Sequence, residues 1–213
     1  QEPKNQTVLA EYAAILKKLG YWESLADILP ALKKSRALDS QEFAFLEEQY
    51  WAGKLASAAD LDELLAIWKS LSKKQQMNPV IVAEYVEQRI GWEQEVSLQT
   101  LLEKVIKKQW DDRLVYQYGR LTLGPGFERL KLAEKWHQTM PDKKENPVLL
   151  LTLGRLACQS QLWGLGQSYL KESLKLQPQV ETFHSLAQCY EAEGKDSQAA
   201  ITYKEAIIQL ENK

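Results

Sequence analysis

The chain contains few residues whose types and spacing could support catalysis or metal binding. Its two histidines, His137 and His184, are far apart in the sequence, and there is no His-Glu-x-x-His pattern of the kind that holds zinc. The neighbouring carboxylates Asp111 and Asp112 could act as an acid–base pair. They lie between two helical segments and precede Arg113, so helix N-capping and a local ion pair are the simpler interpretation. These patterns predict neither a metal site nor an enzyme.

Two other motifs also favour structural roles. Gly164-Leu165-Gly166 lies at a predicted helix start but follows no strand, whereas a dinucleotide site requires a βαβ unit. Cys158 and Cys189 lack the Cys-x-x-Cys spacing of redox and zinc sites and lie in apolar helical segments. We interpret them as buried reduced thiols. That state suits a cytosolic environment without excluding others.

The composition indicates a helical protein. Only 10 Gly and 7 Pro occur among 213 residues, while Leu, Ala, Glu, Lys and Gln are abundant. The net charge of −2 argues against a dedicated nucleic-acid-binding protein, which usually carries a basic face. The sequence has no apolar stretch of the roughly 18 residues that a membrane span needs.

An internal repeat is the clearest signal in the sequence. The segment 64–68, Leu-Leu-Ala-Ile-Trp, corresponds to the segment 132–136, Leu-Ala-Glu-Lys-Trp, and both run through polar stretches to an Asn-Pro pair. The Trp residues and the Asn-Pro pairs are each separated by 68 residues, twice the 34-residue period of tetratricopeptide helix pairs. Such a pair cannot bury its apolar face alone and must stack on a neighbour.

The period predicts an all-α fold: a right-handed α-solenoid of about twelve helices in one tetratricopeptide-repeat domain, residues 1–213. The expected helix pairs are approximately 6–38, 45–78, 79–112, 113–146, 147–179 and 180–213. An ordinary helical bundle with periodic surface helices is the alternative.

The quality of the repeat varies along the chain. In the last two pairs the packing positions match well, and the small residues Gly154 and Gly166 would let paired helices approach closely. The centre is degenerate: Arg89 and Arg120 fall at packing positions, and the segment 124–126, Gly-Pro-Gly, shortens a first helix. We therefore expect irregular geometry at the centre.

The sequence contains seven Trp, which raises the alternatives of a ligand pocket and an ordinary core. Trp68 and Trp136 hold the large-residue packing position of their second helices, so we assign them to the core. Trp110 precedes a helix and is expected to pack against its first turns as a hydrophobic staple. The pairs Lys73-Lys74 and Lys143-Lys144 flank helix ends and complement the helix dipole. A weak contact with anionic lipid is the alternative for these lysines, although two-residue clusters are small for it.

The first helices of such a solenoid line its concave face, which is the usual binding surface. Tyr and Arg are enriched at interaction hot spots. The candidate partner-binding residues on this face are Tyr50, Tyr118, Leu121, Leu151, Arg155 and His184. Each of them is alternatively an exposed or packed residue with no partner. The corresponding positions in the first pair are Ala10, Ala14 and Lys17, so the Lys/Asn set that clamps a terminal carboxylate in some tetratricopeptide domains is absent.

Several segments together resemble the proteobacterial HemY family. They are residues 22–34, Trp-Glu-Ser-Leu-Ala-Asp-Ile-Leu-Pro-Ala-Leu-Lys-Lys, residues 49–53, Gln-Tyr-Trp-Ala-Gly, and the junction 110–114, Trp-Asp-Asp-Arg-Leu. The order of these segments ahead of two better-formed C-terminal repeats is also similar, so the resemblance covers nearly the whole chain.

The resemblance implies a bacterial inner-membrane protein linked to a late step of protohaem synthesis. Its soluble domain is expected on the cytoplasmic side, held by an N-terminal membrane anchor upstream of this chain. The family resemblance implies a non-catalytic scaffold whose groove docks protein partners, expected to be late haem-biosynthesis enzymes, and no bound cofactor. The alternative is a haem- or porphyrin-binding or handover module, in which His184 would be an axial ligand.

Overall fold

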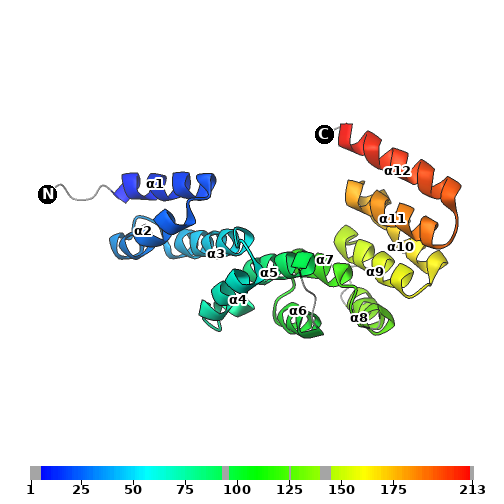
Figure 1. Ribbon diagram of the computed structural model, residues 1–213, viewed down its shortest axis with the longest axis horizontal. Coiled ribbons are helices and arrows are strands. Elements are labelled where there is room, and N and C mark those ends of the chain that lie inside the picture. Colours follow the sequence, from blue (N-terminus) through cyan, green and yellow to red (C-terminus); the bar gives the residue numbers. More distant parts are fainter. Residues whose placement is uncertain (1–5, 93–95, 125, 140–144, 212–213) are drawn as a thin grey trace. The chain divides into compact units, whose positions relative to one another are not determined.

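The computed structural model describes residues 6–92, 96–124, 126–139 and 145–211, which are all-α (Figure 1). The helices are α1 (Gln6–Leu19), α2 (Trp22–Ser35), α3 (Ser40–Ala56), α4 (Leu61–Ser70), α5 (Pro79–Trp92), α6 (Val96–Lys108), α7 (Asp112–Arg120), α8 (Gly126–Thr139), α9 (Pro147–Gln159), α10 (Trp163–Leu176), α11 (Val180–Ala192) and α12 (Asp196–Glu211), with a short 3₁₀ turn, η1 (Gln75–Met77). No strand occurs in these ranges. The all-α class and the twelve helices are confirmed.

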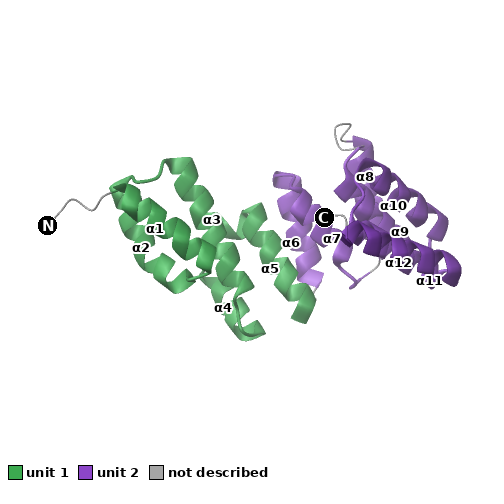
Figure 2. Ribbon diagram, turned by 90° about the horizontal axis from the view of Figure 1, so that it is seen from above, with its two compact units in different colours: residues 1–93 green, residues 94–213 purple. Residues whose placement is uncertain are grey.

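The chain forms two compact units, residues 1–93 and 94–213 (Figure 2). The boundary falls between α5 and α6, inside the predicted pair 79–112. The single domain and the right-handed solenoid stay predictions. Every predicted pair contains two helices. The second pair begins earlier than predicted because Asp39 and Glu42 form a capping box that starts α3 at Ser40.

In unit 1, α1, α2 and α3 enclose a core of buried residues: Ala13, Leu16, Leu25, Leu32, Leu46 and Tyr50. Further along this unit, Trp68 of α4 stacks on Tyr85 of α5 with ring centroids 3.9 Å apart. Arg89 is buried and donates a hydrogen bond to the Tyr85 hydroxyl at 3.2 Å. The arginine at a packing position is thus accommodated by a hydrogen bond to the neighbouring tyrosine.

The repeated Asn-Pro pairs make the same contacts in both units. Asn78 and Asn146 each accept a hydrogen bond at 2.9 Å from a backbone N–H in the first turn of the following helix. Their amide groups also donate to a carboxylate near or on the first helix of the preceding pair: Asn78 to Glu48 at 2.7 Å and Asn146 to Asp112 at 2.9 Å. One side chain therefore caps a helix and ties successive pairs together, which explains the spacing of the motif.

In unit 2, α9 and α10 lie side by side at an unusually close approach (Figure 1). A Cβ atom on Gly154 would overlap the Leu170 side chain and lie 3.2 Å from the backbone oxygen of Gly166. A Cβ on Gly166 would overlap the Cys158 sulfur and lie 3.1 Å from the backbone oxygen of Gly154. The predicted role of both glycines in helix approach is confirmed.

The irregular centre is supported by a buried arginine. Helix α7 is short, as predicted: it has nine residues, and the turn after it contains Gly124 with φ of +76°. Arg129 of α8 is buried and donates hydrogen bonds to the Leu121 backbone oxygen and to Gln159 Oε1. Burial lowers the pKa of this guanidinium. The first of these hydrogen bonds satisfies the Leu121 carbonyl, which the shortened helix leaves free.

Helix α7 begins with the predicted cap. Asp111 accepts hydrogen bonds from the Arg113 backbone N–H at 2.9 Å and from the Arg113 guanidinium at 2.7 and 2.9 Å. Trp110 donates to Asp112 Oδ1 at 2.8 Å and meets Trp136 edge-on. The capping role of Asp111 and the core position of Trp136 are confirmed. Hydrogen bonding to Arg113 lowers the pKa of the Asp111 carboxyl.

We expect this cap to make part of the stability of unit 2 pH-dependent. The Asp111 pKa is lower in the folded state than in the unfolded state. The carboxylate therefore contributes to the free energy of unfolding above the unfolded pKa of about 4, and this contribution is lost as the pH falls below that value. Asp111→Ala should destabilise the chain by about 1 kcal/mol at pH 7. Urea unfolding at several pH values should show this difference shrinking towards pH 2, whereas a difference independent of pH would contradict the assignment.

Two sequence interpretations need correction. Cys158 of α9 and Cys189 of α11 are not free thiols but form a disulfide, with Cα atoms 5.7 Å apart. Each cysteine lies on the first helix of its pair, and stacking of the pairs brings them together although 31 residues separate them. Tyr12 and Ile207, which the repeat pattern predicts at packing positions, are exposed because α1 and α12 are the first and last helices of the described chain. Lys143 and Lys144 lie outside the described residues.

Candidate functional site

A hollow of about 410 Å³ lies in unit 2 on the face formed by α7, α9 and α11, the first helices of three successive pairs. Arg120 comes from α7, Arg155 from α9 and His184 from α11. The Cys158–Cys189 disulfide also lines the hollow and joins two of its three helices covalently. The repeat architecture thus brings one side chain of each helix to a common surface.

Arg155 is held in place on several sides. Its Nε donates to Ser185 Oγ at 2.9 Å, and its Nη2 forms an ion pair with Glu181. The guanidinium lies over the ring of Tyr116, 5.0 Å from its centroid. The side chain is only 12% exposed, and Nη1 is buried without a hydrogen-bond partner. A buried donor in this state is unusual in a native structure.

Arg120 shares the same aromatic ring. Its guanidinium lies 5.4 Å from the Tyr116 centroid, and Nη1 donates to Gln117 Oε1 at 3.1 Å. The hollow is therefore lined by two arginines and one carboxylate, that of Glu181. This local excess of positive charge contrasts with the net charge of −2 for the whole chain.

Four of the candidate partner-binding residues are not at any surface. Tyr50 packs in the core of unit 1, and Leu151 packs in the core of unit 2. Tyr118 is buried, and its hydroxyl donates to Glu103 at 2.8 Å; burial first, and then this carboxylate, raise the pKa of Tyr118. Leu121 is also buried. Assigning these four residues to an accessible groove is wrong, because all four side chains are buried in the packed interior of their units.

Arg155 and His184 are the two candidates that line the hollow. The exposed His184 ring lies 5.8 Å from the ring of Tyr203, while His137 packs near Tyr169 elsewhere in unit 2. That a partner contacts Arg155 or His184 stays a prediction. Arg120 also lines the hollow but is not among the residues predicted from the sequence, although its failure to fit an apolar packing position was the signal that could have identified it.

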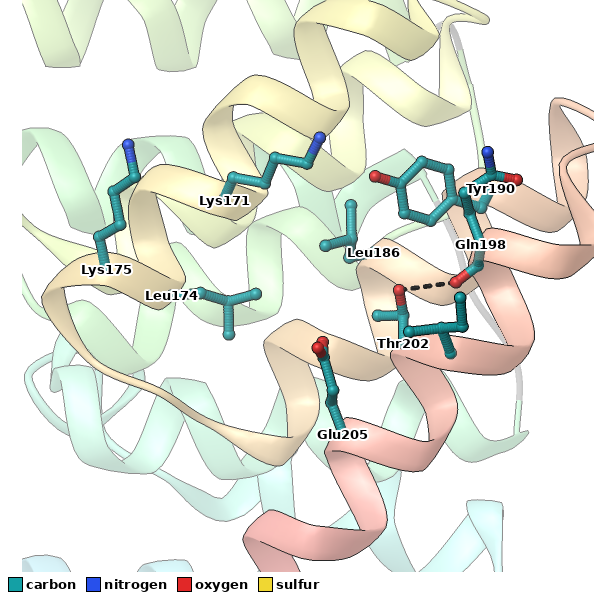
Figure 3. Close-up of a pocket in the computed structure, with 9 residues that line it drawn as sticks. Lys171, Leu174, Lys175, Leu186, Tyr190, Gln198, Thr202 and Glu205 are labelled. Atoms are coloured by element: carbon teal, nitrogen blue, oxygen red, sulfur yellow. Dashed lines mark hydrogen bonds between the residues drawn. The ribbon is translucent and has the colours of Figure 1, made fainter.

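A second hollow, of about 500 Å³, lies between α10 and α12 over α11 (Figure 3). Leu186 lies between the two outer helices, with Lys171 and Lys175 on one side and Glu205 on the other. The Lys171 ammonium group approaches the ring of Tyr190 to 5.7 Å. Charges of both signs line this hollow, and the pocket-lining lysines are exposed, so it offers no fixed cation comparable with Arg155.

Among the described residues, no group of three His, Cys, Asp or Glu side chains is arranged to hold a metal ion. Nor does any helix in the described ranges combine the length and apolar character that a membrane span requires.

The fold and the hollow define a helical-repeat protein with a charged hollow on the first helices of unit 2. The resemblance to the HemY family is confirmed by curated relatives. Protein HemY of Escherichia coli (strain K12) and Protein HemY of Shigella flexneri are each 28% identical over 203 residues, 94% of this chain. This alignment covers 50% of each relative, so the chain spans about half the length of the curated relatives it matches.

No family model matches the chain. Among solved structures, MamA MSR-1 C2 aligns with a TM-score of 0.44 and 16% identity over 78% of this chain and 98% of that one. A mutant form of MamA aligns with a TM-score of 0.40 and 14% identity, covering 76% of this chain and 97% of that one.

Proposed function

We propose that this chain is a non-catalytic scaffold that docks partner proteins on the face formed by α7, α9 and α11. The observation that carries the proposal is the hollow of about 410 Å³ in which three successive first helices converge with Arg120, Arg155 and His184. Repeat proteins use such extended surfaces for protein recognition. The candidate residues bind and orient a partner, and none is assigned a chemical step.

The HemY resemblance supports a role at the bacterial inner membrane, beside a late step of haem biosynthesis, with enzymes of that step as the partners. The attachment to the membrane would be the N-terminal anchor that the resemblance implies.

Crosslinking of the intact, full-length protein in cells tests this role. Recovery of a late haem-biosynthesis enzyme with the wild-type protein, and its loss when the groove residues Arg155 and His184 are changed together, is the expected result. Lys175→Gln, on the other hollow, is the control and should leave recovery unchanged. If no enzyme of haem synthesis is recovered with the wild-type protein, the proposed association is wrong.

The side of the membrane needs its own test. The family resemblance implies the cytoplasmic side, whereas the Cys158–Cys189 disulfide favours an oxidising compartment, because cytosolic thiols are kept reduced. Alkylation of the protein in intact cells before lysis, followed by mass analysis, distinguishes the two. Fully alkylated cysteines support the cytoplasmic side, and an intact disulfide supports the oxidising side.

A haem- or porphyrin-binding module is the second candidate. The exposed imidazole of His184 lines the same hollow as Trp163, Arg120 and Arg155, which offers an axial ligand, an apolar wall and cations for propionate groups. Haem titration followed in the Soret band tests it. His184→Ala should abolish the shift and His137→Ala should not, whereas equal binding by both variants would exclude ligation by His184.

A further inference from the structure

We propose that the hollow formed by α7, α9 and α11 recognises an acidic peptide segment of a partner protein, whose carboxylate pairs with Arg155 beside Arg120. This inference rests on the proposed docking function and adds the chemistry of the partner.

The state of Arg155 is the first argument. Two of its three guanidinium nitrogens are bonded, Nε to Ser185 and Nη2 to Glu181, while Nη1 is buried and has no partner. Leaving a buried charged donor unsatisfied is unfavourable, because the group loses its hydrogen bonds to water and gains none in the protein. A fold retains such a group most readily where a ligand completes its bonding, and the natural acceptor for a guanidinium is a carboxylate.

The second argument is that the arginine is already positioned. Glu181 and Ser185 fix it from α11, and the Tyr116 ring supports its face at 5.0 Å. Arg120 lies near the same ring at 5.4 Å. Because little side-chain freedom remains to be lost, binding of an anion needs less ordering than binding to exposed lysines.

Charge complementarity is the third argument. The side chains lining the hollow carry two guanidinium groups and one carboxylate, in a chain whose net charge is −2. A basic segment would meet both arginines unfavourably, and an apolar segment would leave the Nη1 donor of Arg155 unsatisfied. An acidic segment satisfies the donor and balances the local charge.

The disulfide contributes to the same surface. It joins α9, which carries Arg155, to α11, which carries Glu181 and Ser185, and thus fixes the spacing of the two walls. A groove whose walls are covalently joined is preorganised for its occupant.

The test uses the whole chain and a dye-labelled peptide of alternating Glu and Ser, with a second peptide carrying Gln in place of every Glu. Fluorescence anisotropy should show binding of the Glu peptide only, and the binding should weaken as salt is added. A C-terminally amidated Glu peptide separates recognition of side-chain carboxylates from recognition of the terminus. Equal affinity for the Glu and Gln peptides would overturn the proposal.

Arg155→Gln should reduce the affinity about tenfold or more, since a charge-assisted pair contributes about 1.5–3 kcal/mol. Arg120→Gln should reduce it by a smaller factor. Lys175→Gln makes the same change of charge at the hollow between α10 and α12 and should have no effect. Circular dichroism establishes that each variant is folded, and Arg155→Lys, which keeps the charge but not the planar fork, should recover only part of the affinity.

A larger loss with Lys175→Gln than with Arg155→Gln would place the anion site at the other hollow and refute the proposal. If crosslinking recovers protein partners and Arg155→Gln alone leaves that recovery unchanged, the scaffold function stands and the acidic partner is wrong.

Discussion

Replacing Gly154 with Val should destabilise unit 2 by about 3 kcal/mol, at the upper end of the usual effect of overpacking. A Cβ at Gly154 would overlap the Leu170 side chain, and it would lie 3.2 Å from the backbone oxygen of Gly166. The side chain could move, but the backbone of α10 could do so only if the two helices separated. The packing free energy lost when the two helices separate therefore exceeds the modest gain in helix propensity that Val has over Gly.

Gly164→Val is the matched control. It introduces the same side chain into α10, where nothing lies within 4 Å of an added Cβ. Urea unfolding followed by circular dichroism gives the difference between the variants, and hydrogen exchange assigns the loss to α9 and α10. Equal stability of Gly154→Val and Gly164→Val would contradict the close helix approach.

Reduction of the Cys158–Cys189 disulfide should destabilise unit 2 by a similar amount. A crosslink that closes a loop of 31 residues contributes about 3–4 kcal/mol by restricting the unfolded chain. For a unit of this size we expect the melting temperature to fall by about 10 °C in the presence of reductant. Scanning calorimetry with and without a dithiol, with mass analysis to verify complete reduction, measures the change.

The double variant Cys158→Ala, Cys189→Ala should melt near the reduced wild-type protein and be insensitive to the dithiol. Hydrogen exchange in α1–α5, which belong to unit 1, is the internal control and should not change on reduction. Full reduction without a change in the melting temperature would show that the crosslink does not stabilise the fold. Reduction should also weaken binding of the Glu peptide, because it releases α11 from α9.

The repeat predicted much of the local structure because the same physical demand recurs at fixed spacing. Asn78 and Asn146 each cap a helix and bond to a carboxylate near or on the preceding pair's first helix, so their spacing could be recognised without coordinates. Gly154 and Gly166 could be recognised likewise, because only a small residue permits close helix approach. The predicted start of α3 was less accurate, because the Asp39–Glu42 capping box begins that helix several residues before the repeat pattern does.

The candidate site was predicted only in part. Periodicity identifies the helix positions that face a neighbour, but it does not distinguish a residue at the edge of the stack from one inside it. Tyr118 and Leu151 were assigned to the groove on residue type and position, and both are buried. The sequence identified Arg120 only as a residue that does not suit an apolar packing position, although it lies with Arg155 near the ring of Tyr116.

The sequence by itself therefore determined the all-α class, the helix pairs and the HemY resemblance, since these depend on local propensity, capping and spacing along the chain. Only the tertiary structure decided the disulfide, the buried placement of four candidate residues and the unsatisfied nitrogen of Arg155. Cys158 and Cys189, like Arg155 and Glu181, lie on different helices and meet only when successive pairs stack. Such contacts depend on the angle and rotation of one helix against another, which side-chain packing sets across the whole unit.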